Sequence, residues 1–156
     1  MTLLWRSLLS FVALPGVVAF VVPLFLIARR DNGNHPAAVV PLCTGLLVLL
    51  WCVRDFYVRG RGTLAPWDPP QRLVTAGLYG YSRNPMYLGV LLLLFGWAVA
   101  FATRGHLTYA VVMVVVFHLR VVFFEEPWLA DTHGAEWTRY RTQVNRWFGR
   151  KTRLST

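Results

Sequence analysis

The 156-residue chain lacks the features by which many soluble enzymes hold a metal or a nucleotide. It has two cysteines, no Cys-x-x-Cys pair and four scattered histidines, so no metal-ligand spacing is present. No Gly-x-Gly-x-x-Gly follows a candidate strand, which argues against a hidden nucleotide-binding domain. Cys43 and Cys52 fall on one expected helix, about 13 Å apart by helical rise, which is beyond the reach of a disulfide. A small-residue cleavage site is also missing, so we expect the apolar N-terminus to be a retained first span.

Acidic residues are scarce, since 7 Asp and Glu stand against 16 Lys and Arg, for a formal net charge of +9. The chain is 56% hydrophobic with a mean hydropathy of +0.46, more than a soluble core needs. These values predict a membrane protein with a single domain over residues 1–156. The basic residues flank apolar runs, where they set topology and contact anionic lipid. We therefore expect a lipid bilayer, and no nucleic acid, as the partner.

Four apolar runs predict an all-α fold, an integral membrane bundle of four transmembrane helices. We place these helices at about 8–28, 36–53, 86–103 and 107–124. Aromatic and apolar residues spaced along one side of the tail, with arginines around them, predict a C-terminal interfacial amphipathic helix at about 127–147.

The distribution of Lys and Arg predicts the topology of these spans. With both termini on one side, twelve Lys and Arg fall on that face and three on the other, and Arg120 lies inside the fourth span. By the positive-inside rule, both termini and the polar stretches described next should face the cytoplasm, at the inner membrane if the source is bacterial.

Two polar stretches interrupt or end the apolar runs. The first, Leu73–Gly89, reads LVTAGLYGYSRNPMYLG and is punctuated by glycine. Irregular backbone near the hydrocarbon is tolerated only against protein or a water-filled cavity, so this stretch should line a site. The second, Phe123–Phe148, reads FFEEPWLADTHGAEWTRYRTQVNRWF and should close that site from the other side.

Charged residues at the end of the fourth span have two interpretations. A central Arg costs at least about 2.5–3.5 kcal/mol, so Arg120 should face the bundle interior or reach the nearby surface. In the simpler interpretation, Glu125 or Glu126 only neutralises it. In the functional one, His118 and Glu125 share a helix face while Glu126 points about 100° away. Both glutamates then face one ligand only if the helix ends there, which Pro127 makes plausible.

The first stretch offers groups that suit a cationic ligand. Tyr79, Tyr81 and Tyr87 provide aromatic faces that attract sulfonium or ammonium groups, although for Tyr81 we favour an interfacial aromatic belt. Asn84 either caps the helix that Pro85 begins or contacts a ligand, and both roles stay open.

In this order, LVTAGLYGYSRNPMYLG, EEPWL and HGAEWTRYRTQVNRW resemble the integral-membrane methyltransferases that include isoprenylcysteine carboxyl methyltransferases and phospholipid methyltransferases. The resemblance covers roughly residues 62–150 and implies S-adenosylmethionine, bound between the last two spans and the C-terminal helix. It implies a cofactor site lined or held by Val74, Tyr79, Asn84, Pro85, Met86, Tyr87, Glu125 and Glu126. It also implies substrate contact by Arg120 and catalytic roles for Arg120 and Glu125, with Glu125 and Glu126 facing the charged end of the cofactor. We take His118 as a further candidate for substrate contact.

The resemblance leaves the methyl acceptor open, because Asn84 stands where the carboxyl methyltransferases more often have histidine. A prenylated cysteine carboxylate, a phospholipid amine, a small thiol and other hydrophobic molecules all stay candidates, and the oligomeric state is not indicated. A carboxylate or thiolate needs no strong base, and Arg120 could orient it; an amine must lose a proton, for which His118 or a glutamate is the candidate. The alternative to an enzyme is a small transporter or scaffold that uses the cluster of Arg120, Glu125 and Glu126.

Overall fold

In a computed structural model of the chain, residues 12–26, 35–60 and 72–150 are described. Within these ranges the fold is all-helical, as predicted, and strand-like pairing is limited to one bridge between Val144 and Arg150. The elements in chain order are the π-helix η1 (Val12–Val21), α2 (Val22–Phe25), the 3-10 turn η2 (Pro36–Ala38), α3 (Val39–Asp55), the π-helix η3 (Phe56–Gly60), the 3-10 turn η4 (Gly77–Gly80), α4 (Pro85–Phe101), α5 (Arg104–Arg120), the π-helix η5 (Val121–Glu125) and α6 (Glu126–Gln143).

Two continuous helical segments are long and apolar enough to cross a membrane, Pro36–Gly60 and Arg104–Gln143. Two further apolar helices, Pro15–Phe25 and Pro85–Phe101, are shorter. Parts of the first expected span, residues 8–11 and 27–28, lie outside the described residues. The layout with four spans therefore stays a prediction, while the apolar helices themselves lie where the hydropathy placed them.

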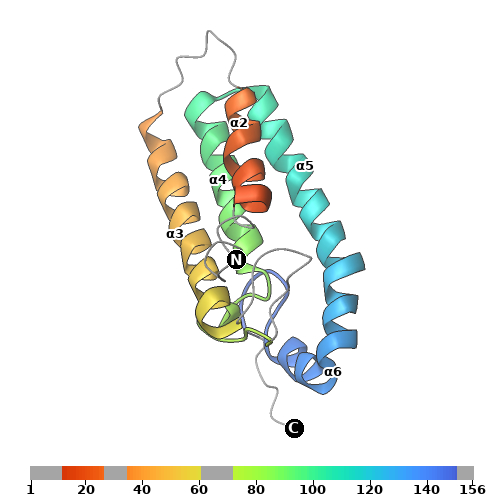
Figure 1. Ribbon diagram of the computed structural model, residues 1–156. Helices are drawn as coiled ribbons and strands as arrows, with labels where there is room; N and C mark the ends of the chain where they lie inside the picture. The colour runs from red at the N-terminus through yellow and green to blue at the C-terminus, as the bar shows by residue number, and fades with distance from the viewer. Residues whose placement is uncertain (1–11, 27–34, 61–71, 151–156) are drawn as a thin grey trace.

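Close backbone contact joins α3 and α4, which lie side by side in Figure 1. A Cβ at Gly45 would lie 2.7 Å from the carbonyl oxygen of Gly89, and one at Gly96 would lie 2.7 Å from Leu42. Small residues at a helix interface let two backbones approach closely, the arrangement typical of membrane helices. Leu49, Leu93 and Leu94 are at most 1% exposed and fill the core beside these contacts.

The N-terminal helices are tied to α4 and α5 by side chains that donate to backbone carbonyls. Trp97 Nε1 donates to Ala19 at 2.9 Å, and the Tyr109 hydroxyl donates to Val18 at 3.2 Å. Pro23 has no N–H to donate to the carbonyls four and five residues before it, which are those of Ala19 and Val18, so the two side chains satisfy carbonyls that this proline leaves free. They fix the end of the bundle remote from the polar stretches.

The tail helix differs from its prediction in length and in what its apolar side contacts. It begins at Glu126, bends at Gly134 (φ 47°, ψ −114°) and ends at Gln143, short of residue 147. Its buried side, formed by Trp137 and Tyr140, packs with Val144 against Leu73 of the first polar stretch. The prediction of an apolar side lying in the membrane interface is therefore wrong for these residues, because the protein itself covers them.

Candidate functional site

The first polar stretch rests on the end of α3. Val74 and Tyr79 are each 6% exposed and pack against Cys52, while Phe56 meets the Tyr79 ring edge-on at 5.4 Å between centroids. Burial raises the pKa of Tyr79 well above its usual value, and the neighbouring Cys52 adds to this. Tyr79 therefore stays protonated and neutral. Val74 and Tyr79, which are both predicted to line the cofactor site, thus lie in one buried cluster. Their role in cofactor binding stays a prediction.

Helix α4 begins at Pro85, as predicted, directly after Asn84. The Asn84 side chain makes no capping hydrogen bond; its Nδ2 donates to the Arg146 carbonyl at 3.1 Å instead. Of the two roles left open, capping is therefore excluded in this structure. The backbone N–H of Asn84 donates to the Ser82 hydroxyl at 3.1 Å. Met86 packs against two buried clusters, the one that contains Leu93 and the one that contains Tyr79.

Three predicted residues meet where α4 faces the end of α5. The Tyr87 hydroxyl donates to the Glu125 carboxylate, and Arg120 Nε donates to both, at 3.0 Å to the hydroxyl and 2.9 Å to Glu125 Oε1. The ion pair is partly open, with the Arg120 side chain 46% exposed and that of Glu125 29%. The neutralisation of Arg120 by a glutamate is thus confirmed, and the pair lies at the surface of the molecule.

The π-helix η5 brings Arg120 and Glu125 together. In an α-helix, five residues turn through about 500°, which would leave the two side chains about 140° apart around the axis. In the i→i+5 pattern of a π turn, residues five apart lie nearly one above the other, and such turns are frequent at functional sites. The helix also continues past Pro127, which sits in the first turn of α6, so the expected break between the glutamates is wrong.

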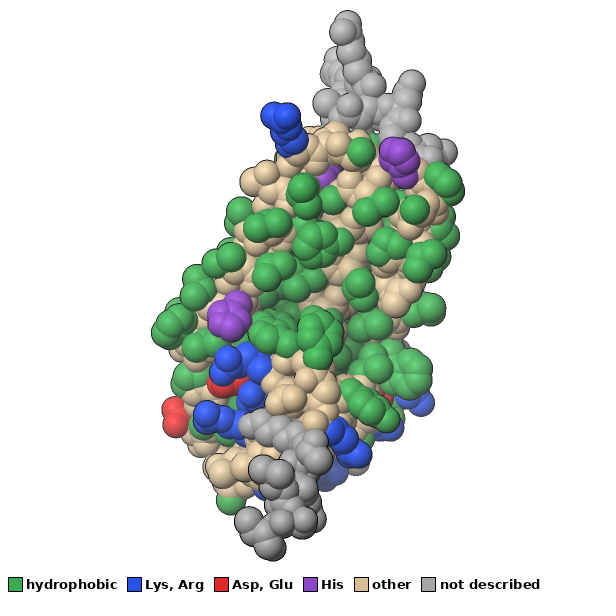
Figure 2. Space-filling view, turned by 180° about the vertical axis from the view of Figure 1, so that it is seen from behind, with side chains coloured by type: hydrophobic (Ala, Val, Ile, Leu, Met, Phe, Trp, Pro, Cys, Tyr) green, Lys and Arg blue, Asp and Glu red, His purple; other side chains and the backbone are tan. Residues whose placement is uncertain are grey.

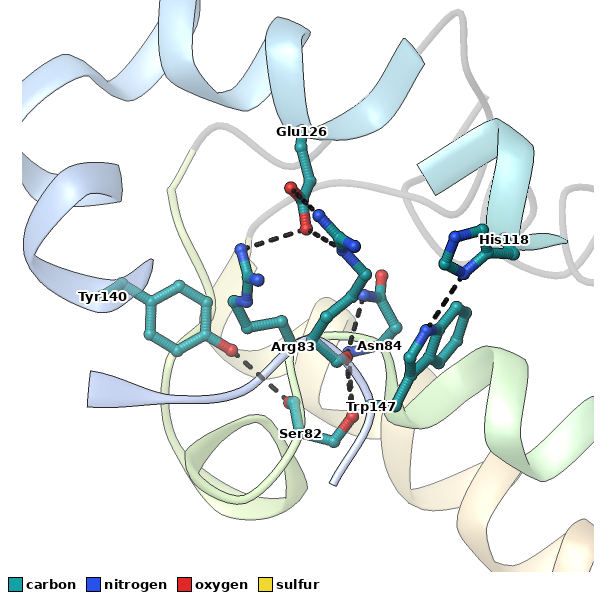
Figure 3. A network of polar contacts seen from close by, with 8 residues as sticks. Ser82, Arg83, Asn84, His118, Glu126, Tyr140 and Trp147 are labelled. Atoms are coloured by element: carbon teal, nitrogen blue, oxygen red, sulfur yellow. Dashed lines mark hydrogen bonds and ion pairs between the residues drawn. The ribbon is translucent and has the colours of Figure 1, made fainter. Parts of the chain in front are cut away.

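Glu126 belongs to a second, more buried network, which Figure 3 shows. Its carboxylate accepts from Arg146 Nε at 2.7 Å and from Arg146 Nη2 at 2.8 Å. Arg83 Nη1 lies 3.1 Å from the same carboxylate, and the Arg83 guanidinium sits 5.3 Å from the centre of the Trp137 ring. Burial lowers the pKa of Arg83, and the Glu126 carboxylate opposes that shift. Glu126, predicted to hold the cofactor, is thus bound on both sides by protein arginines.

A segment that we term the C-terminal strap, residues 144–150, lies over the loop that precedes α4. The Arg146 carbonyl accepts from both Ser82 and Asn84, while the Arg83 amide donates to the Asn145 carbonyl at 3.1 Å. Below the strap, the Tyr140 hydroxyl donates to the Tyr79 carbonyl at 2.7 Å. The two polar stretches are therefore joined, as predicted, largely through backbone carbonyls.

His118 contacts the strap and not Glu125. Its Nδ1 accepts from Trp147 Nε1 at 3.3 Å, and the two rings stack at 6.0 Å (Figure 3). The helical phase assumed for His118 and Glu125 fails because the π turn lies between them. Trp147 also packs against the core cluster that contains Phe117, whose ring is 4.6 Å from that of Tyr87.

Sequence reasoning missed several residues that the structure places at the site: Arg83, Tyr140, Arg146 and Trp147. Arg83 directly precedes Asn84 and Pro85 in the first polar stretch, but nothing in the sequence shows that it is buried against Glu126. Arg146 and Trp147 lie in a tail whose arginines and aromatic residues looked interfacial. Which arginine faces an acid depends on how the strap folds back.

Comparison with known proteins now identifies the family. The sequence profile of the phospholipid methyltransferase family matches residues 35–136. The chain belongs to this family. This confirms the resemblance that the motifs indicated. Family membership and the long apolar helices together make the chain an integral membrane protein.

Two curated proteins are similar to this phospholipid methyltransferase family member over about half of its length. Methanethiol S-methyltransferase 1 of Bradyrhizobium diazoefficiens is 34% identical over 76 residues, which make up 49% of the chain and 26% of that protein. Methanethiol S-methyltransferase of Crocosphaera subtropica is 33% identical over 75 residues, 48% of the chain and 28% of that protein. The chain thus aligns with little more than a quarter of either relative. No solved structure matches.

Proposed function

We propose that this protein is an S-adenosylmethionine-dependent methyltransferase of the membrane that acts on a small or lipophilic acceptor. The observation that carries this proposal is the cluster of Tyr87, Arg120 and Glu125, which is partly open to the surface where α4 meets the end of α5. Family membership supports methyl transfer, and the cluster offers groups that can hold both reactants.

The chemistry of the cluster fits a sulfonium cofactor. Glu125 is a partly exposed carboxylate that can accept a cationic ammonium, whereas Glu126 is already bound by two arginines. The adjoining rings of Tyr87 and Phe117 provide aromatic faces of the kind that attract sulfonium. When bound, the cofactor supplies an electrophilic methyl group. The task of the protein residues is to hold the two reactants in line and to exclude water.

The same groups favour an acceptor that reacts as an anion. Among the described residues near the cluster, Glu126 binds Arg83 and Arg146, and His118 Nδ1 accepts from Trp147, while we assign Glu125 to the cofactor, so no further base is free for the acceptor. An amine must give up a proton before it attacks, while a carboxylate or thiolate attacks directly. Arg120 is the cation placed to orient such an anion.

A thiol is the acceptor that we propose first, because both curated relatives are named for methanethiol. The thiol loses its proton to water, a loss that a nearby arginine promotes by stabilising the thiolate. The thiolate sulfur then bonds to the methyl carbon as the bond from that carbon to the sulfonium sulfur breaks. The products are the uncharged thioether and the demethylated donor, whose sulfur is now an uncharged sulfide. The positive charge of the sulfonium and the negative charge of the thiolate are therefore both lost in this step.

The site's surroundings are consistent with access from the membrane. Phe123 and Phe124 beside the cluster are 65% and 71% exposed, and hydrophobic side chains cover the upper part of the face shown in Figure 2. Charged side chains gather at the lower end of that face, the end at which α6 lies in Figure 1. We propose that this end faces the cytoplasm, that the chain forms a single domain, and that an apolar acceptor enters laterally.

A charge relay of a transporter is not favoured by the distribution of acids. The described acidic residues are Asp55, Glu125, Glu126, Asp131 and Glu136, and all lie in the turns or helices at the site's end of the molecule. A relay through the bilayer would need ionisable groups at depth within the helices.

Calorimetry on the detergent-purified protein tests the proposal, with S-adenosylmethionine as titrant and S-adenosylhomocysteine as a second ligand. We expect saturable binding of both, and transfer of labelled methyl to an alkanethiol in preference to a fatty acid or alkylamine of equal length. Absence of binding at millimolar cofactor would refute the cofactor assignment. Methylation of the amine at the rate of the thiol would refute the anionic acceptor.

A further inference from the structure

The last residue of α3, Asp55, is a buried acid that the proposed reaction does not use. Its side chain is 0% exposed. Within the part of the chain that the structure describes, neither carboxylate oxygen has a hydrogen-bond partner. The nearest cations among the described residues are Arg54 Nη1 and Arg59 Nε, 3.6 and 3.7 Å from Oδ1. A buried charge with such loose pairing costs free energy, and an apolar residue of similar volume is often as stable or more so. Stability alone therefore gives a weak reason for an acid here.

The carboxylate lies directly against Gly77, the first residue of the turn η4. Gly77 has φ +66°, a conformation that other residues rarely adopt. A Cβ built on Gly77 would collide with Asp55 Oδ2 and would lie 3.3 Å from Arg59 Nη1. The acid and the guanidinium thus occupy the place where a side chain at Gly77 would be, and they fix where the turn begins.

This turn carries Tyr79 into the site. Tyr79 packs on Cys52, one helical turn before Asp55, and Phe56 lies edge-on against its ring. On its other side, the Tyr79 carbonyl accepts from the hydroxyl of Tyr140, which belongs to α6. Movement of the turn at Gly77 would therefore be transmitted to a predicted cofactor residue and to the second polar stretch.

We propose that Asp55 is a positioning residue, whose carboxylate, held by Arg59 against Gly77, fixes η4 and with it the place of Tyr79 at the cofactor site. The inference rests on the proposed function for its catalytic meaning, but the contact between Asp55 and Gly77 can be tested without any ligand. Asp55 does not touch the reacting groups in this role.

The experiment compares Asp55→Asn and Asp55→Glu with the control Asp131→Asn, which changes an exposed acid of α6, all in the full chain. Two quantities are measured: hydrogen exchange of peptides covering residues 73–81 without ligand, and the dissociation constant for S-adenosylmethionine. We expect faster exchange in both Asp55 variants and an affinity weaker by about tenfold, because a displaced turn no longer holds Tyr79 in its place at the cofactor site. Asp55→Glu should not rescue binding, because the longer side chain cannot fit against Gly77.

A further variant covers the case in which Asp55→Asn does not fold. Arg59 is 42% exposed, so Arg59→Gln should fold, and we expect it to change exchange and affinity in the same direction by a smaller factor. Unchanged exchange over residues 73–81 in these variants would overturn the inference, as would wild-type affinity in Asp55→Glu. If the wild-type protein bound no cofactor, the proposed function would fail, while exchange would still decide whether Asp55 holds the turn.

Discussion

Adjacent residues at this site have separate tasks, and Glu125 and Glu126 illustrate this best. The Glu125 side chain is 29% exposed, and its carboxylate accepts hydrogen bonds from the Tyr87 hydroxyl and the Arg120 guanidinium. Glu126 is 10% exposed in its side chain and is held by two arginines. The first can exchange its partners for a ligand, whereas the second is part of the scaffold that holds the C-terminal strap.

Neutralising each glutamate should therefore have a different effect. We expect Glu125→Gln to weaken S-adenosylmethionine binding about tenfold with little change in the unfolding temperature, since a charged contact is lost at an open site. Glu126→Gln should lower the unfolding temperature, because it leaves the buried Arg83 guanidinium without its acid. Calorimetry and thermal unfolding in detergent measure the two effects, with the exposed Glu136→Gln as control. Equal losses of affinity and equal unfolding temperatures in the two variants would contradict this division.

Arg120 should govern the pH dependence of thiol methylation. The cation favours the thiolate, so the acceptor thiol is held below its free pKa when it lies beside Arg120. We expect Arg120→Gln to slow methylation of an alkanethiol about tenfold at neutral pH, because a rise of about one unit in the pKa of the bound thiol leaves about a tenth of the thiolate. The rate of the variant should approach that of the wild type as the pH rises. Arg120→Lys should retain part of the rate. Rate profiles against pH measure this, with Arg104→Gln at the remote end of α5 as control. A parallel loss at every pH would contradict the role in thiolate formation.

At the scale of elements, helix contacts and one π turn place the site. The glycines of α3 and α4 allow the backbones to meet, and this contact holds the end of α3 beneath the loop that precedes α4. The π turn η5 then rotates the chain between Arg120 and Glu125, so that α5 and α6 contribute to one site. Neither feature supplies a reacting group, but both determine where the reacting groups lie.

The close contact between α3 and α4 predicts a strong effect of side-chain size. Gly45→Leu should greatly reduce the yield of folded protein, because even a Cβ would approach the Gly89 carbonyl to 2.7 Å. Gly105→Ala serves as the control, since a Cβ there meets nothing nearer than 4.0 Å. Gel filtration and thermal unfolding in detergent measure the outcome. Wild-type stability of Gly45→Leu would mean that the two helices are farther apart than in this structure.

At the scale of the whole molecule, charge and apolar surface are segregated. Figure 2 shows most charged side chains of its face near the end at which α6 lies in Figure 1, and mainly hydrophobic side chains over the rest. An integral membrane protein with this pattern holds its polar site at one membrane surface. A cofactor that is soluble in water and an acceptor that is soluble in lipid can both reach such a place.

Reporter fusions in a bacterial host test the proposed topology. With both ends cytoplasmic, green fluorescent protein attached after Thr156 should fluoresce, and alkaline phosphatase at the same position should be inactive. Phosphatase inserted at Gly33, between the first two expected spans, should be active, because that connection would face the other side. Active phosphatase at the C-terminus would reverse the orientation. Phosphatase activity at both positions would rule out an even number of spans.

The sequence by itself determined the membrane class, the helical fold, the family and most of the chemical groups of the candidate site. Hydropathy and charge bias are sums over many residues, so they can be obtained from the sequence without knowledge of the tertiary contacts. The ordered motifs also placed Tyr87, Arg120 and Glu125 in one site, and the structure brings these three into direct contact.

Only the tertiary structure decided which acid binds which cation and which groups stay accessible. No pattern in the sequence indicates the π turn between Arg120 and Glu125, because a change of the backbone hydrogen bonds from i→i+4 to i→i+5 has no residue type of its own. It also could not show that Arg146 folds back onto Glu126, or that Asp55 lies beneath Gly77, since both contacts join segments far apart in the chain. Pairing of this kind depends on burial and direction, which are properties of the folded chain.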